Sequence, residues 1–356
     1  MSALPSGPLR QSESEASRQA FSPERTLAVM ESMRRPSGAF VAARTEDYGA
    51  FWLRDHLFIV FSYYYLGEYE KLKRGMQVAF DFFRKERYKL ERLSFPDDPG
   101  KSYEYLNAKV NPDTLEELTR EWGHHQLDAI GLFLYLAADL KFKNVDVRRD
   151  ETDSDILQLL AFYLRNVRYW ERPDFGMWED RWELHSSSIG ACVAGLDYGK
   201  RERLITVPEE LISRGRDALD RLLPRESASR DCDMAQLSLI WPYHIVKNGV
   251  ADQILENVRS RLVQRHGVNR YWDDAWPHRS KDGVSPEWVL GFDWLSIIHA
   301  QRHEMEEARF WFDRSTALMI GDAVPELYVD GNPGEHTPLA WAHAMKLIAW
   351  AKIFKK

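Results

Sequence analysis

Hydrophobic and polar positions follow a helical period along nearly the whole chain. From about residue 23 onward, apolar residues recur at spacings of three and four, and no clean alternation of useful length indicates a strand. Periodicity and stop signals together predict about twelve helical segments. They begin near Pro23, Phe51, Tyr69, Gly123, Thr152, His185, Pro208, Met234, Ala251, Pro286, His303 and Pro338.

These segments alternate in character along the chain. The even-numbered ones are apolar nearly all round, as in residues 57–61, 132–137 and 189–194, whereas the odd-numbered ones carry a charged face. A helix that is apolar all round is buried, and a helix with a charged face looks outward. Strict alternation therefore predicts an all-α toroid, an (α/α)6 barrel with an inner and an outer ring. An irregular helical bundle is the alternative, and the absence of a convincing sequence repeat disfavours a solenoid.

The two ends of the chain differ in composition. Residues 1–22 are rich in Ser, Pro, Glu and Arg and predict a flexible tail, while residues 23–356 are expected to form one domain. Neither a signal-peptide core nor a stretch long enough to span a bilayer is present. Cys192 and Cys232, the only cysteines, lie in apolar helical stretches and suit a reducing compartment. We expect a cytoplasmic protein without a membrane partner.

Charge and aromatic content narrow the class of ligand. The net charge is −7, so no general basic field attracts phosphate backbones and a nucleic-acid partner is not expected. The chain has 13 Trp, and several of them stand beside charged residues in short polar stretches. A tryptophan that served only the core would be unusual there.

Chemically active residues cluster on the segments that lead into the predicted inner helices. In an antiparallel ring of hairpins these segments lie on one rim. They are residues 51–55, 121–128, 173–180, 271–274 with 286–288, and 324–328. Their Trp, Arg, Asp, Glu and Gln side chains suit sugar, because carboxylates and Arg pair with adjacent hydroxyls and indoles stack on the ring. Glu179 and Glu326 are the candidate proton donor and water-activating base.

Each of these features also has a purely structural interpretation. Arg54 and Asp55 alone would suit a helix-start ion pair, and Glu287 follows a Ser-Pro pair, which favours a helix-dipole role over catalysis. His124 and His125 are adjacent, so on a helix they diverge and cannot share a metal ion. The chain also lacks Gly-x-Ser-x-Gly and phosphate-loop motifs. We therefore expect neither a metal ion nor an organic cofactor.

Three of the rim motifs resemble those of glycoside hydrolase family 15, the glucoamylase family. Residues 173–179, Pro-Asp-Phe-Gly-Met-Trp-Glu, resemble its Pro-Asp-x-Gly-Ile-Trp-Glu signature, which implies that Glu179 is the general acid. Residues 52–55, Trp-Leu-Arg-Asp, are similar to its Trp-x-Arg-Asp motif, whose Arg and Asp hold the terminal glucose. Trp122-Gly123 with Gln126 is similar to its Trp-Gly-x-x-Gln segment, where the Trp lines the sugar site.

Other stretches are more similar to one branch of that superfamily. Residues 122–129, 183–190 and 324–328 resemble the glucoamylase-like domain of the phosphorylase kinase α and β subunits, and Trp341-Ala342-His343-Ala344 matches a segment of both branches. Secreted glucoamylases place the base in an Ala-Glu-Gln type motif, whereas Glu326 stands in Val-Pro-Glu-Leu-Tyr. Its role as base is assigned by its position before the last inner helix.

The resemblance implies an inverting, exo-acting glycosidase on α-glucosides, with Glu179 as acid and Glu326 as base. Its partner would be an oligosaccharide or a small glucoside. The expected substrate-binding residues are Trp52, Arg54, Asp55, Trp122, Gln126, Asp128, Trp178 and Trp288. The rival hypothesis is a non-catalytic carbohydrate sensor or regulatory subunit, since a fold does not by itself carry activity. Another (α/α)6 enzyme, such as a sugar epimerase or a mannoside hydrolase, would lack this set of motifs.

Overall fold

A computed structural model describes residues 21–118, 120 and 122–355. The predicted flexible tail, residues 1–22, lies outside the described residues except for Phe21 and Ser22. The side chain of Ser22 caps the first helix, α1 (Pro23–Glu31), by accepting the backbone N–H of Arg25.

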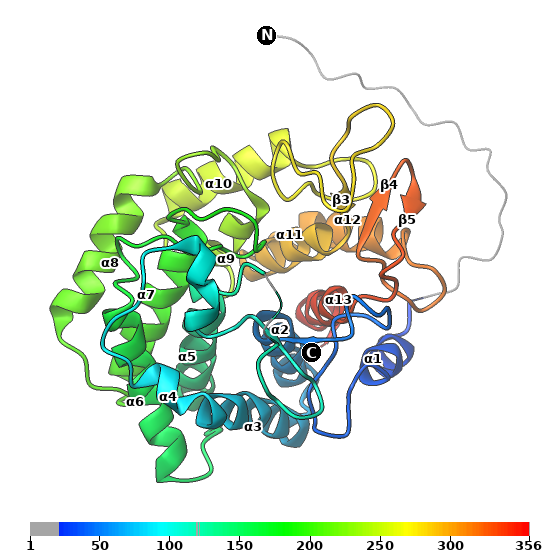
Figure 1. The fold of residues 1–356 in the computed structure, drawn as a ribbon. Coiled ribbons are helices and arrows are strands. Elements are labelled where there is room, and N and C mark those ends of the chain that lie inside the picture. The colour runs from blue at the N-terminus through cyan, green and yellow to red at the C-terminus, as the bar shows by residue number, and fades with distance from the viewer. Residues whose placement is uncertain (1–20, 119, 121, 356) are drawn as a thin grey trace, which may run out of the picture.

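Two concentric sets of helices form the molecule, as Figure 1 shows, and the predicted (α/α)6 toroid is confirmed. The inner set comprises α2 (Leu53–Leu66), α5 (Leu127–Phe142), α7 (Ser186–Arg201), η2 (Met234–Gln236) with α9 (Leu237–Ile240), α11 (Leu290–Gln301) and α13 (Ala340–Phe354). The outer set comprises α1, α3 (Tyr69–Lys85), α6 (Glu151–Asn166), α8 (Glu209–Leu222), α10 (Asn248–Arg261) and α12 (Met305–Thr316). The short helices α4 (Arg87–Leu90) and η1 (Pro99–Glu104) lie between α3 and α5.

Burial follows the alternation that the sequence predicts. Helix α5 is buried on all sides over most of its length, whereas α3 buries one stripe that includes Leu72, Met76, Ala79 and Phe83. That spacing keeps the buried side chains on one face of a 3.6-residue helix. The eighth segment begins at Met234, as predicted, and ends at Ile240, because the residue before Pro242 is disfavoured in the helical conformation.

Short strands tie together the loops at one end of the ring. Strand β1 (Phe51–Trp52) pairs with β2 (Lys109–Val110), and β4 (Leu327–Val329) lies between β3 (Glu287–Trp288) and β5 (Asn332–Pro333). The predicted start of the tenth helix at Pro286 is therefore wrong, because β3 intervenes and α11 begins at Leu290. The expected dipole role of Glu287 is wrong for the same reason. Its carboxylate instead accepts the backbone N–H of His266.

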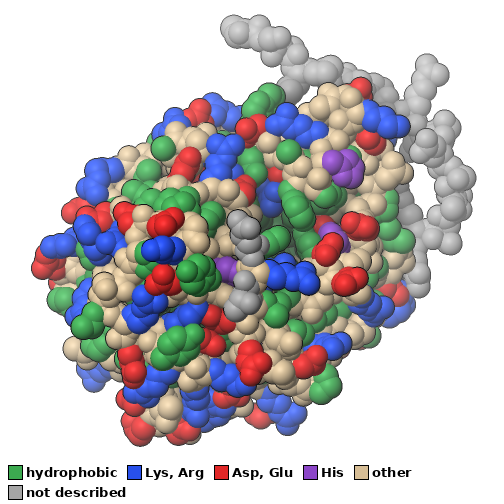
Figure 2. Space-filling model, viewed as in Figure 1, with side chains coloured by type: hydrophobic (Ala, Val, Ile, Leu, Met, Phe, Trp, Pro, Cys, Tyr) green, Lys and Arg blue, Asp and Glu red, His purple; other side chains and the backbone are tan. Residues whose placement is uncertain are grey.

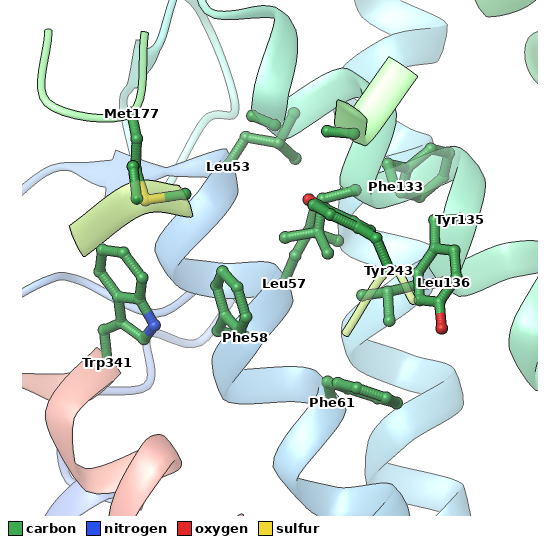
Figure 3. Close-up of a cluster of buried hydrophobic side chains, with 14 of the residues drawn as sticks. Leu53, Leu57, Phe58, Phe61, Phe133, Tyr135, Leu136, Met177, Tyr243 and Trp341 are labelled. Carbon is green, nitrogen blue, oxygen red and sulfur yellow. The ribbon is translucent and has the colours of Figure 1, made fainter. Parts of the chain in front are cut away.

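Aromatic side chains fill the space between the inner helices. Phe58 of α2 stacks on Trp341 of α13 with ring centroids 5.1 Å apart and meets Trp294 of α11 edge-on at 5.8 Å. Figure 3 shows Phe58 between Trp341 and Leu57, with Phe61 one turn further along the helix. Phe61 in turn stacks on Trp241 at 5.9 Å. The centre of the toroid is thus a packed core rather than a channel.

The surface matches the modest net charge of the chain. Figure 2 shows Lys, Arg, Asp and Glu side chains intermixed over the face seen in Figure 1, without a field of one sign. Among the described residues, no helix is both long and apolar enough to cross a membrane.

Candidate active site

A pocket of about 400 Å³ opens at the end of the ring where the inner helices begin. Its walls include most of the predicted site residues, namely Trp52, Arg54, Asp55, Trp122, Trp178, Glu179, Trp288 and Glu326. Gln126 and Asp128, which were also predicted to bind substrate, are not among its lining residues. Segments far apart in the sequence therefore meet at one rim, as the toroid requires.

Glu179 stands on a tight loop that directs its side chain into the pocket. The loop is closed by paired backbone hydrogen bonds between Asp174 and Glu183 at 3.0 and 3.1 Å. Gly176 has a φ of +63°, and a Cβ there would lie 2.8 Å from the ring of His185. Glu179 itself has a φ of +64°, a conformation uncommon for non-glycine residues and concentrated at functional sites.

The carboxylate of Glu179 is surrounded by hydrogen-bond donors. The Arg54 guanidinium binds Oε1 at 2.9 Å, and the indole N–H of Trp52 donates to Oε2 at 3.3 Å. The indole N–H of Trp122 donates to the same oxygen. Because all three partners are donors, the arrangement suits the ionised carboxylate.

A lysine lies over the two tryptophans that bind Glu179. The ammonium group of Lys109 stands 3.8 Å from the centroid of the Trp122 ring and 4.7 Å from that of Trp52. Such cation–π contacts hold an indole in place when they are partly desolvated. Burial lowers the pKa of Lys109, and the negative charge of Glu179 opposes that shift.

Gln126 and Asp128 lie behind Arg54, on the side away from the pocket. The Arg54 guanidinium donates to Oε1 of Gln126 and to Oδ2 of Asp128, each at 3.1 Å. Its contact with Asp55 is longer, at 3.9 Å, so the helix-start ion pair is the weakest of its ionic contacts. Gln126 and Asp128 thus orient Arg54 and do not line the pocket.

Asp55 presents its carboxyl group to the pocket beside Arg54. Burial raises its pKa to about 7, and the charges of Glu179 and Asp128 add to that effect while Arg54 opposes it. Burial therefore favours the protonated form of this carboxyl group, which can donate a hydrogen bond as well as accept one.

Glu326 immediately precedes β4 and is almost fully buried, with 1% of its surface exposed. Its backbone carbonyl accepts the N–H of Val289 at 3.1 Å, which fixes it to the start of α11. Burial raises the pKa of its carboxyl group to about 8, against the effect of a hydrogen bond from Tyr48 and the charge of Arg270. Among the described residues, its Oε2 has no hydrogen-bond partner.

Several pocket residues escaped the sequence analysis. Tyr48 contacts Glu326, and its hydroxyl accepts the indole N–H of Trp276 at 3.2 Å. Arg270 pairs with Asp274 at 2.6 and 2.7 Å and lies over the ring of Trp288 at 4.6 Å. No motif marked these positions. The exception is Trp341, whose segment at the start of the last inner helix was already noted for its resemblance.

The histidines of the rim point to different partners. The ring of His124 contacts the backbone carbonyl of Arg120 at 2.6 Å, whereas the ring of His125 packs on Tyr105 with centroids 3.8 Å apart. In the described part of the chain, no group of three or more His, Cys, Asp or Glu side chains is placed to hold a metal ion.

The molecule is an (α/α)6 toroid, and its pocket brings together two glutamates, an Arg–Asp pair and tryptophan walls. This combination defines the class of six-hairpin glycosidase folds. The family comparison agrees with that class. The chain belongs to glycosyl hydrolases family 15, whose model matches residues 25–330.

Curated relatives with similar sequences are regulatory proteins. The chain is 27% identical over 284 residues to the probable phosphorylase b kinase regulatory subunit alpha of Caenorhabditis elegans, covering 64% of this chain and 23% of that protein. It is 26% identical over 302 residues to the corresponding Drosophila melanogaster protein, covering 72% and 23%. The chain therefore spans about a quarter of the length of these relatives.

Solved structures with the same fold are titled as glycosidases or glucoamylases. A structure titled as a wild-type glycosidase has a TM-score of 0.78 and 20% identity, covering 93% of this chain and 95% of that one. A bacterial glucoamylase complexed with acarbose has a TM-score of 0.68 and 14% identity, covering 92% of this chain and 54% of that one. At these identities the likeness shows the fold.

Proposed function

We propose that residues 23–356 form one catalytic unit that acts as an inverting, exo-acting glycosidase on α-glucosides. Protonated Glu179 donates to the glycosidic oxygen, and ionised Glu326 activates a water molecule on the opposite face of the sugar. The observation that carries the proposal is that a single pocket collects both glutamates together with Arg54 and Asp55. No metal ion or organic cofactor takes part in this reaction.

The shape of the pocket favours attack at a chain end. Trp341 lines the pocket and stacks on Phe58, which packs on Trp294 deeper in the toroid. The pocket therefore ends blindly against the aromatic core and accepts the end of a sugar chain, whereas a through-going groove would accept its middle. Removal of terminal units follows from that geometry.

The polar groups of the pocket suit the terminal sugar. Arg54 and Asp55 offer adjacent donors and acceptors of the kind that bind neighbouring hydroxyls. Trp122, Trp178 and Trp288 supply flat walls, and the Trp178 indole is fixed by a 2.7 Å hydrogen bond to Asp233. Fixed walls reduce the entropy that substrate binding must overcome.

Two solved neighbours support the ligand class. A glycosidase variant with a glutamate-to-alanine replacement was solved in complex with glucose, and the bacterial glucoamylase was solved with acarbose. Both ligands belong to those proteins. The proposal extends this ligand class to the present pocket through the family relationship.

The environments of the two acids in the structure are the reverse of those that the proposed reaction requires. Three donors surround Glu179, although a general acid must carry a proton, and burial favours the protonated form of Glu326. Substrate must therefore draw Arg54 from Glu179 toward its own hydroxyls. It must also bring the water molecule that hydrates Glu326 and favours ionisation.

The same resting arrangement favours a second candidate function, a non-catalytic carbohydrate sensor. If Arg54 stays on Glu179 when sugar binds, the pocket recognises a chain end without cleaving it. The curated relatives, named as regulatory subunits, are consistent with that role. The two functions share a ligand and differ in turnover.

Proton NMR of maltose-type oligosaccharides incubated with the protein separates these functions. The proposal predicts release of β-glucose, with Glu179→Gln and Glu326→Gln each abolishing release while leaving the circular dichroism spectrum unchanged. Release of α-glucose, or full activity in either variant, would overturn the assignment of acid and base. Saturable binding without release identifies the sensor.

A further inference from the structure

A second cavity, of about 370 Å³, lies at the opposite end of the toroid from the active-site pocket. It is lined by Phe61, Tyr64, Tyr65, Tyr135, Asp139, Phe142, Lys143, Tyr198, Trp241, Pro242, His244, Gln301 and Lys352. Most of these residues stand near the last turns of inner helices. Along α2, Arg54 and Tyr65 are separated by roughly 16 Å of helix. The aromatic core around Phe58 fills the space between the two cavities.

The charged groups of this cavity are unbalanced. The ammonium group of Lys143 pairs with Asp139 at 2.5 Å. The ammonium group of Lys352 donates to the neutral side chain of Gln301 at 2.9 Å. Within the described part of the chain it has no carboxylate partner. The imidazole of His244 contacts Gln301 at 3.0 Å, and burial lowers its pKa, which favours the neutral form. The wall thus holds two cations and one anion.

The excess positive charge contributes to a lowered pKa of Lys352. Burial lowers its pKa to about 8, and the charge of Lys143 adds to that shift while Asp139 opposes it. An unpaired cation in a partly dry cavity is costly, and a bound anion would relieve that cost.

The aromatic residues of the cavity favour an anion over a neutral sugar. Lys143 lies 4.7 Å from the ring centroid of Tyr64, and Lys352 lies 5.1 Å from that of Tyr65. Ammonium groups thus cover the faces on which a neutral sugar would stack. Among the described residues, the hydroxyls of Tyr64 and Tyr198 make no hydrogen bond and remain available as donors. The wall is therefore rich in donors, which is the complement of phosphate oxygens.

We propose that this cavity binds a phosphorylated monosaccharide, with the phosphate between Lys143 and Lys352. The cavity volume lies in the range of small-molecule sites and exceeds the space that a free phosphate ion fills. The proposal does not depend on catalysis at the other end of the toroid, so either can fail alone.

Isothermal titration calorimetry of the full chain tests the proposal with four probes at pH 8. Glucose 6-phosphate or glucose 1-phosphate is expected to bind with one-to-one stoichiometry, more tightly than inorganic phosphate and far more tightly than glucose. Because the anion raises the pKa of Lys352, binding should take up protons, and the measured heat should depend on the ionisation enthalpy of the buffer.

Two substitutions at the same end of α13 provide the matched comparison. Lys352→Met should weaken binding by about tenfold or more, as the loss of one charge-assisted contact predicts. Lys355→Met removes an equal charge whose ammonium group binds the carbonyl of Tyr65 and does not line the cavity, so it should retain affinity. Lys352→Met should melt no lower than the parent, because it removes an unpaired charge.

Three results would overturn the proposal. Unchanged affinity in Lys352→Met would show that the cavity is not the site. Loss of binding in Asp55→Asn, a change in the active-site pocket, would place the ligand there instead. Equal affinity for glucose or for inorganic phosphate would exclude a phosphorylated sugar as the specific ligand.

Discussion

Arg54 and Glu179, which are 125 residues apart in sequence, form a 2.9 Å ion pair on the wall of the active-site pocket. The same guanidinium binds Asp128 at 3.1 Å on its other side. Arg54 is therefore shared between a carboxylate that lines the pocket and one that lies behind the guanidinium. How readily Arg54 leaves Glu179 depends on how firmly Asp128 holds it.

Replacing Asp128 with Asn tests this competition. The amide preserves a hydrogen bond to Arg54 but removes a negative charge, so Arg54 binds Glu179 more tightly and yields less easily to substrate. We expect KM for maltose-type oligosaccharides to rise by about tenfold, with a smaller change in kcat. Steady-state kinetics measures both values.

Asp197→Asn provides the control, because Asp197 pairs with Arg201 and Arg216 away from the pocket. It should leave both kinetic constants unchanged. A fall in kcat with KM constant in Asp128→Asn would contradict the proposed competition and indicate a role in the chemical step.

The buried position of Glu326 sets the pH range in which it acts as a base. The pKa of its carboxyl group is raised to about 8, whereas an ordinary glutamate titrates near 4.5. A base must be ionised, so the acidic limb of kcat/KM, a ratio that reports the free enzyme, should have its midpoint near pH 8. A profile already at its plateau by pH 6 would contradict ionisation of Glu326 as the controlling event.

Tyr48→Phe should shift that profile in a defined direction. The hydrogen bond from Tyr48 lowers the pKa of Glu326, so its removal raises this pKa and moves the acidic limb of kcat/KM to higher pH. At neutral pH the variant should lose activity and recover part of it in more alkaline buffer. An equal loss at every pH would point instead to misplacement of the carboxyl group.

Gly123 allows the Trp122 loop to approach the Glu179 loop. A Cβ at this position would lie 2.7 Å from the Glu179 carbonyl oxygen and 2.9 Å from the ring of Phe175. Gly123→Ala should therefore displace Glu179 and reduce kcat by about a hundredfold, as a shift near 1 Å can do. Gly249→Ala is the control, since nothing lies within 4 Å of a Cβ there, and it should leave kcat unchanged.

The sequence predicted those parts of the site that rest on local signals. The alternation of apolar and charged helices predicted the toroid, and the run that ends at Glu179 predicted a loop that brings this glutamate into the pocket. The sequence could not show that Gln126 and Asp128 lie behind Arg54, because that distinction depends on which side of the guanidinium each faces. The start of α11 was misplaced because a cap-like Ser-Pro pair precedes a strand.

Tyr48, Arg270 and Trp276 were missed for a different reason. They lie on loops without helical periodicity, and their contacts with Glu326 and Trp288 join distant segments. Loop residues of this kind acquire a role only from the fold that positions them. The raised pKa of Glu326 was equally invisible, since it comes from burial by the assembled rim.

One tryptophan of this rim is exposed to an unusual degree. Trp272 lies between Tyr271 and Trp276, both of which line the pocket, yet 81% of its own surface is exposed. Its backbone is nevertheless fixed, because its carbonyl accepts the Ser285 hydroxyl at 3.0 Å. An exposed indole on a backbone that is held beside the pocket is suited to stack on substrate units beyond the one that we propose is cleaved.

Trp272→Ala should therefore discriminate between substrates by length. We expect kcat/KM for oligosaccharides of five or more units to fall by about tenfold, the loss of one aromatic contact, while the value for the disaccharide changes less than twofold. Phe310→Ala removes an exposed aromatic side chain from the outer helix α12 and should change neither value. The measurement is kcat/KM for a series of oligosaccharides of increasing length. An equal loss of kcat/KM at every length would mean that Trp272 shapes the pocket itself. If long chains alone are affected, the rim loop that carries Trp272 forms an extended binding surface next to the pocket.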